Sequence, residues 1–76
     1  MIVKLTGSRT GLDRASLIRL IIDHAGYRLY DAKHCVDDLL AGQVVCIAVA
    51  TDDAAMEFLE HALELGAIAH LAGQEE

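Results

Sequence analysis

The segment that most constrains the fold of this chain is QVVCIAVA, which runs from Gln43 to Ala50 and carries no charge. It is short for a helix, and its β-branched residues favour a strand. An apolar run without polar alternation is typical of a strand that is covered on both faces. Helical patterns precede and follow it. We therefore expect this segment to be the most buried strand of a sheet that packs against helices.

The rest of the chain also alternates between strand and helix patterns. MIVKLT at the N-terminus alternates as a half-buried strand does. Asp13 and Thr51 are suitable N-cap residues, and Gly26 can end the first helix in a left-handed conformation. The elements predicted for one domain, residues 1–76, are a strand at 1–6, helices at 14–25 and 29–41, a strand at 43–50, a helix at 52–65, a strand at 67–72 and a tail at 73–76. This β-α-α-β-α-β order predicts an α+β fold in two layers, with the helices packed over a small sheet.

Each predicted helix has an apolar stripe for the core and a polar outer face. On the first helix the stripe is Leu17, Ile18, Ile21 and Ala25. Charged residues four positions apart on the outer faces predict weak ion pairs. These pairs are Arg19 with Asp23, Lys33 with Asp37, His34 with Asp38, and His61 with Glu57.

The charges of the chain are segregated along the sequence. The first 33 residues hold all six basic residues and three acidic ones, a net charge of +3, while the remainder holds nine acidic residues, so the chain totals −6. Such segregation either marks a binding face or reflects ordinary solvation of a small protein. Because backbone phosphates require clustered cations and the total is acidic, we do not expect direct nucleic-acid binding. The basic residues are Lys4, Arg9, Arg14, Arg19, Arg28 and Lys33.

The apolar content predicts a protein partner or a homodimer. Of the 76 residues, 54% are hydrophobic, and so short a chain cannot bury all of them. For a homodimer, the apolar run Val44–Val49 is the candidate contact. No apolar run is long enough for a membrane span, and no secretion signal follows Met1, so we expect a cytoplasmic protein. Cys35 and Cys46 are expected to be reduced and to serve as small apolar residues.

Motifs for catalysis, metals and phosphate are weak or missing. GSRTG, within the predicted loop Gly7–Leu12, lies between a strand and a helix, where anions can bind, but it lacks the Lys-Ser/Thr of a P-loop. No C-x-x-C motif and no pair of histidines four apart indicates zinc. No serine or cysteine has a recognisable base beside it. We therefore predict no catalytic residues, no metal and no cofactor, so the chain is not expected to be an enzyme.

The first two helices carry most of the cations. If these helices form a hairpin through Gly26, their basic side chains can surround a small exposed apolar patch. A basic rim around apolar residues suits an acidic protein surface, because charge sets the association rate and apolar contact sets the affinity. The cations are Arg14, Arg19, Arg28 and Lys33, and the apolar residues are Leu20, Leu29 and Tyr30.

The stretch Arg14–Lys33, RASLIRLIIDHAGYRLYDAK, resembles the helix-turn-helix in the C-terminal domain of the bacterial ribosomal stalk protein of the large subunit. The stretches Asp52–Ala54 and Ala62–Glu64, with Gly66 and Ala67, resemble the third helix of that family and its end, with spacing that differs by one residue. The helix-turn-helix match has no gap and falls at Arg14, Leu17, Ile18, Arg19, Gly26, Leu29, Asp31, Ala32 and Lys33.

The resemblance implies a β-α-α-β-α-β domain with a small three-stranded antiparallel sheet and no enzymatic activity. It also implies that the first helical hairpin docks translational GTPases such as elongation factors Tu and G. Leu17 and Ile18 also lie on the core stripe, so each has a structural interpretation as well. The partner-binding candidates are Arg14, Leu17, Ile18, Arg19, Arg28, Leu29 and Lys33.

The chain departs from that family at several positions. Ile22 replaces a basic residue, Asp23 and Arg28 replace glycines, and Tyr30 replaces a lysine. The N-terminal segment that dimerises the family and tethers it to the ribosome is absent, so the chain resembles a free-standing copy of the domain. The same fold occurs in the Clp protease adaptor, and VVCIAVAT resembles the central strand of that family. The alternative function is therefore an adaptor-like substrate-binding module, although the Asn-Asp-Asp of that family has no match in the loop Gly7–Asp13.

Overall fold

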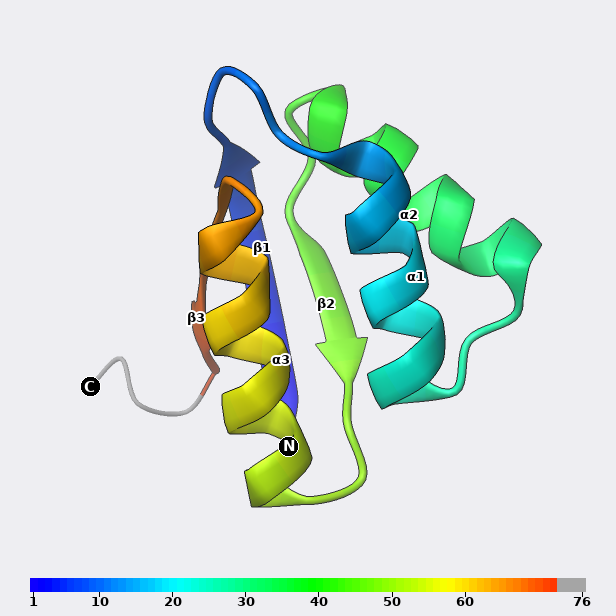
Figure 1. Cartoon of the computed structure of the whole chain (residues 1–76), viewed down its shortest axis with the longest axis vertical. Coiled ribbons are helices and arrows are strands. Elements are labelled where there is room, and N and C mark those ends of the chain that lie inside the picture. The colour runs from blue at the N-terminus through cyan, green and yellow to red at the C-terminus, as the bar shows by residue number, and fades with distance from the viewer. Residues whose placement is uncertain (73–76) are drawn as a thin grey trace.

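The computed structural model describes residues 1–72, and its elements follow in the order β-α-α-β-α-β (Figure 1). The α+β class is confirmed, and each predicted helix differs from the observed one by at most one residue. The predicted tail at 73–76 lies outside the described residues. The elements are β1 (Ile2–Ser8), α1 (Arg14–Ala25), α2 (Leu29–Leu40), β2 (Val45–Ala48), α3 (Asp52–Glu64) and β3 (Ala67–Leu71).

The three strands form one antiparallel sheet in the order β2-β1-β3. The prediction that 43–50 is the most buried strand is wrong, because β1 is central and β2 is a short edge strand. Along β2 the burial alternates: Val45 and Ile47 are buried, whereas Cys46 and Ala48 are exposed. The sequence of β2 is continuously apolar because its exposed positions, Cys46 and Ala48, hold small residues, which tolerate solvent at little cost in free energy.

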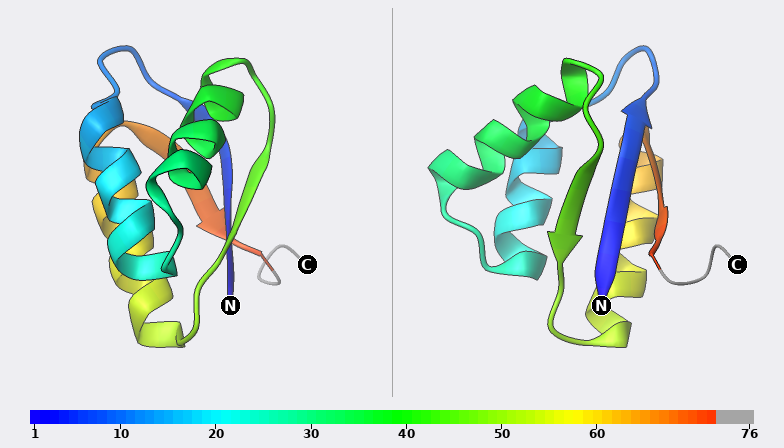
Figure 2. Two further views of the ribbon diagram at one scale, coloured as in Figure 1. Left: turned by 90° about the vertical axis from the view of Figure 1, so that its right-hand side faces the viewer. Right: turned by 180° about the vertical axis from the view of Figure 1, so that it is seen from behind.

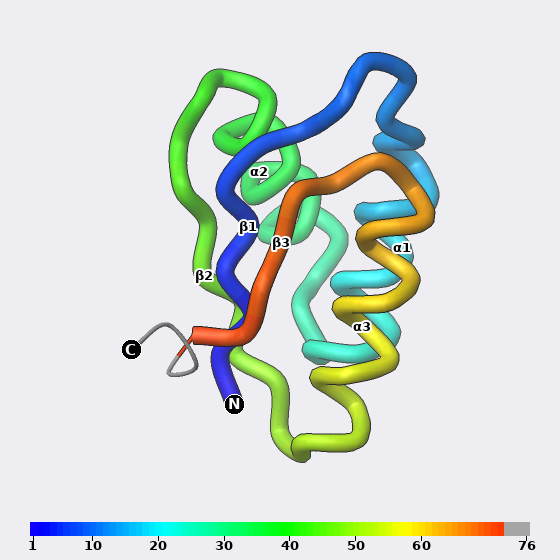
Figure 3. Tube along the Cα trace, turned by 90° about the vertical axis from the view of Figure 1, so that its left-hand side faces the viewer, coloured from blue at the N-terminus to red at the C-terminus, as the bar shows by residue number. Residues whose placement is uncertain are grey.

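The helices of the described residues all pack on one face of the sheet (Figure 2, right). No helix of residues 1–72 covers the opposite face, which is called the bare face below. Val3 and Leu5 of β1 point toward the helices and are fully buried. In Figure 3, β3 faces the viewer at the edge of the sheet, with α3 beside it. The largest fully buried side chains are Phe58, Leu5, Leu17, Ile21, Leu39, Ile47, Val3 and Val36.

Two predicted N-caps are present. A carboxylate oxygen of Asp13 accepts from the Ser16 amide over 3.1 Å, and the other accepts from the Ser16 hydroxyl over 2.8 Å. These hydrogen bonds lower the pKa of Asp13, because they favour the ionised carboxylate. Thr51 Oγ1 accepts from the Ala54 amide over 3.1 Å. Gly26 adopts φ 72° after α1, so the predicted left-handed stop is also confirmed.

The loop after β1 is shorter than predicted, since Gly7 and Ser8 continue the strand. A register shift between Leu5 and Gly7 marks an irregularity in the pairing of β1 with β3. The Arg9 amide donates to Gly66 over 2.7 Å, and the Asp13 amide donates to Leu65 over 3.1 Å. These amides are therefore engaged with the α3–β3 junction rather than pointing into an anion site.

Candidate functional site

A groove of about 440 Å³ lies between α1 and α2. Arg14 in the first turn of α1 and Lys33 in α2 both line it. Apolar contact is offered by Ile18, which is half-buried, and by Val36, which belongs to the core. The groove thus combines two cations with an apolar lining. Its residues are Arg14, Ala15, Ile18, Lys33, Val36 and Asp37.

The groove continues onto the outer face of α2. Lys33 and Asp37 also line a second hollow of about 220 Å³, which they share with Tyr30 and His34. The predicted ion pair between Lys33 and Asp37 is not formed in the part of the chain that the structure describes. Among residues 1–72, the Lys33 ammonium therefore has no carboxylate partner where it lines the two hollows.

Apart from Arg19, the predicted contact residues divide into three groups. Arg14, Ile18 and Lys33 line the groove. Arg28 and Leu29 are exposed at the N-terminal end of α2 and do not line the groove. Leu17 is fully buried in the core, so its side chain cannot contact a partner directly.

Arg19 lies apart from the other cations. It lines a hollow of about 280 Å³ between α1 and α3, together with Asp23 and His24. Arg19 follows Arg14 by five positions, which is about 140° around an ideal helix. Hence the expectation that all the hairpin cations gather on one face holds for Arg14 and Lys33 but not for Arg19. The predicted Arg19–Asp23 ion pair is also missing among residues 1–72.

The sequence did not single out Ala15, Val36 or Asp37 for this site. Ala15 and Ile18 are three positions apart on α1, and Lys33, Val36 and Asp37 are three and four apart on α2. Such spacings place residues on one helix face. Spacing alone could have grouped them within each helix. It could not have shown that these two faces meet, because that depends on how α1 packs against α2.

The histidines form ion pairs that differ in part from those predicted. His34 Nδ1 lies 3.3 Å from Asp38, as predicted. His61 pairs with Glu64 over 3.8 Å rather than with Glu57, and Glu57 instead reaches His24 on α1 over 3.7 Å. The described residues hold no cluster of three or more His, Cys, Asp and Glu side chains arranged for a metal ion.

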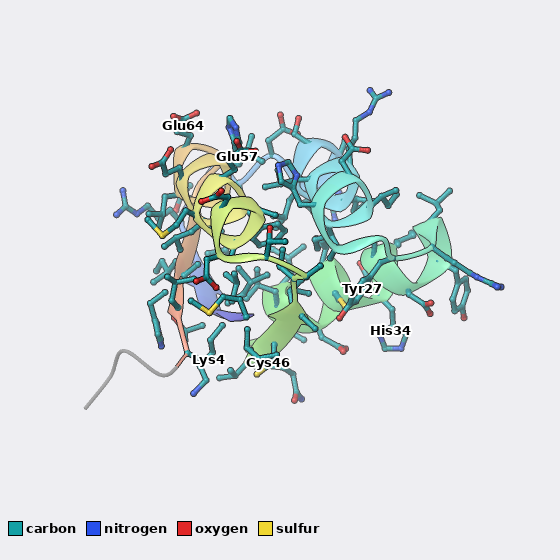
Figure 4. All side chains as sticks on the ribbon, turned by 90° about the horizontal axis from the view of Figure 1, so that it is seen from below. Lys4, Tyr27, His34, Cys46, Glu57 and Glu64 are labelled. Atoms are coloured by element: carbon teal, nitrogen blue, oxygen red, sulfur yellow. The ribbon has the colours of Figure 1, made fainter. Side chains whose placement is uncertain are left out.

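The two cysteines occupy different environments. Cys35 is half-buried on α2, and burial together with Asp38 and Asp31 raises the pKa of its thiol. Cys46 is exposed, so its prediction as a core residue is wrong. Figure 4 shows Cys46 and Lys4 on the bare side of the sheet, away from Glu57 and Glu64 on α3. Both thiols are free in the structure.

The chain was compared with models of known protein families and with curated proteins, and neither comparison gives a match. Within residues 1–72, none of the helices has the length and apolar character that a membrane crossing requires.

Proposed function

We propose that this chain is a non-enzymatic protein-binding domain whose partner docks in the groove between α1 and α2. The observation that carries the proposal is the convergence of Arg14 and Lys33, from different helices, on a groove lined by Ile18 and Val36. A partner that places a carboxylate beside each cation and an apolar side chain against Ile18 would match it in charge and shape. Asp37 is the acidic residue of the lining and repels carboxylates, so the carboxylates of a partner belong beside Arg14 and Lys33 and not beside Asp37.

The partner class that fits best is a translational GTPase. Arg14, Ile18 and Lys33 are positions at which the chain resembles the ribosomal stalk C-terminal domain, and they are the resembling positions that line the groove. Leu29 lies exposed beside them and adds apolar area. Leu17 contributes indirectly, because its burial in the core fixes α1 against the sheet. The domain would act as a relative of the stalk domain, in the cytoplasm, without a cofactor.

The experiment is a calorimetric titration of purified elongation factors Tu and G with the whole chain and with charge-reversal variants. Arg14→Glu with Lys33→Glu is expected to weaken binding roughly tenfold or more, a change of at least about 1.4 kcal/mol. Arg19→Glu is the matched control, since Arg19 is equally charged and exposed but lines the other side of α1. It should bind almost as the unaltered chain does.

The outcomes separate the proposal from its alternatives. Binding that Arg19→Glu weakens as much as the groove variant would move the docking site to the α1–α3 side. No heat with either factor would rule out the GTPase partners. Heat with peptides that begin with a bulky apolar residue, and none with the factors, would favour the adaptor-like module instead. A circular-dichroism melt of each variant verifies that the fold is intact.

A further inference from the structure

β3 forms one edge of the sheet, and part of its backbone points away from the sheet. The Ala72 amide donates to the carbonyl of Ile2 over 2.9 Å, which fixes this pair as hydrogen-bonded in the β1–β3 ladder. Backbone groups along an antiparallel strand alternate between its two edges. The N–H and C=O of Ala69 and those of Leu71 therefore face outward, beyond the last strand among residues 1–72. Their donors and acceptors are available to another strand.

β3 contains none of the residues that usually prevent an edge strand from pairing with another strand. Natural edge strands are commonly blocked by charged side chains or proline. The sequence of β3 is AIAHL, which contains no lysine, acidic residue or proline. Figure 3 shows β3 facing outward with no other described element in front of it.

Exposed apolar side chains flank the same edge on both faces of the sheet. Met56 and Leu63, on α3, are 45% and 43% exposed and lie seven positions apart on one helix face. They are about 140–160° around the helix from His61, which faces α1, so they point to the side of α3 away from α1. On the bare face of the sheet, Ile68 of β3 is 45% exposed.

The opposite edge of the sheet is less suited to a second copy. Figure 1 shows that α1 and α2 extend past β2 on the helix side. A copy related by a two-fold axis at β2 would place its own helices in that space. The run Val44–Val49 is therefore a poorer dimer contact than β3, although it also contains no Asp, Glu, Lys or Arg.

We propose that two copies of this chain associate through β3 and α3. The β3 strands pair antiparallel about a two-fold axis at Ala69, which joins the two three-stranded sheets into one. On the helix side, α3 packs antiparallel against its counterpart, and Met56 and Leu63 of each copy cover those of the other. Such an isologous contact is closed, so it stops at the dimer.

The charges at the two ends of the contact are complementary. Arg9 lies beside Gly66, at the end of α3 from which β3 begins. Asp52 and Asp53 lie in the first turn of α3, at the other end. An antiparallel two-fold axis brings the Arg9 end of one copy to the aspartate end of the other. Attraction at both ends thus offsets part of the repulsion between two chains of net charge −6, to which the two Glu60 side chains near the axis contribute.

This inference does not rest on the proposed function. α2 contacts neither α3 nor β3, so the groove between α1 and α2 lies on the far side of the molecule from the dimer contact. A dimer would present two such grooves at once. Two linked sites can bind a partner carrying two epitopes far more tightly than one site does.

The test is sedimentation equilibrium of the whole chain, from low micromolar concentration up to ~1 mM. At the highest concentration, even a dimer with a Kd of about 1 mM is detectably populated. The mass is expected to rise toward twice the 8.2 kDa of the chain. Leu63→Lys should hold it at the single-chain mass. Leu40→Lys is the matched control, because Leu40 is 42% exposed but lies at the end of α2. Its dimerisation should equal that of the unaltered chain.

A single-chain mass at every concentration overturns the proposal, and so does equal dimerisation of the two lysine variants. Charge reversal tests the geometry in the same experiment. Arg9→Asp should weaken the dimer, and adding Asp53→Arg should restore it. Failure of that restoration overturns the antiparallel arrangement. Amide exchange at Ala69 that slows as the concentration rises supports strand pairing at β3.

Discussion

His24 of α1 contacts two neighbouring residues of α3 in different ways. Its ring packs edge-on against Phe58, with centroids 6.2 Å apart, and its Nε2 lies 3.7 Å from a carboxylate oxygen of Glu57. Phe58 is fully buried, whereas Glu57 is exposed. The two contacts therefore differ in energy: exposed ion pairs contribute about 0–1 kcal/mol, and buried aromatic side chains contribute several times more.

The first prediction compares these neighbours. Glu57→Gln is expected to lower the free energy of unfolding by less than about 1 kcal/mol. Phe58→Ala should lower it by about 3–5 kcal/mol, because the substitution leaves a cavity between α3 and the sheet. Both values come from urea unfolding followed by circular dichroism. Since a chain of this length has roughly 4–11 kcal/mol of stability in total, Phe58→Ala should be close to unfolding at 37 °C. Equal losses of unfolding free energy for Glu57→Gln and Phe58→Ala would contradict the prediction.

The second prediction concerns the N-cap of α1. The folded-state pKa of Asp13 is lowered, so its hydrogen bonds stabilise the fold fully above the ordinary carboxyl pKa. That contribution is lost as the pH falls through the lowered value, when the carboxylate becomes protonated. Asp13→Asn is therefore expected to lose less stability on acidification than the unaltered chain. Thermal melts of both chains from pH 7 down to pH 2 measure the difference, and parallel curves would refute the prediction.

The third prediction separates the two thiols by their rate of reaction. Cys46 is exposed on the bare face of the sheet, whereas Cys35 is half-buried and has a raised thiol pKa. Because the thiolate is the reactive form, Cys35 should react more slowly with an aromatic disulfide reagent at pH 7–8. The time course should show two phases. Cys46→Ser should remove the fast phase and Cys35→Ser the slow one, and a fast phase that survives Cys46→Ser would exclude this assignment.

The wrong predictions of where residues lie have a common physical cause. Helix bounds follow from local signals, such as the Asp13 and Thr51 caps, which act within a few residues. The burial of Cys46 depends on strand order, and the side occupied by Arg19 depends on the direction in which α1 packs. Neither strand order nor packing direction is encoded in local periodicity. The sequence could thus predict that the first helical hairpin is basic, but not which residues line the groove between α1 and α2.

The fourth prediction concerns Gly66, between α3 and β3. Its φ is 104°, a region that other residues rarely adopt, and a Cβ there would lie 3.2 Å from the backbone Cα of Leu12. The Arg9 amide also donates to its carbonyl, so the junction cannot shift without disturbing the loop after β1. Gly66→Ala is therefore expected to destabilise the chain by more than about 1 kcal/mol. Gly11→Ala is the matched control, since Gly11 has a φ of 90° but open space around it. Urea midpoints should fall further for Gly66→Ala, and a larger fall for Gly11→Ala would show that backbone strain, rather than contact with Leu12, dominates at these turns.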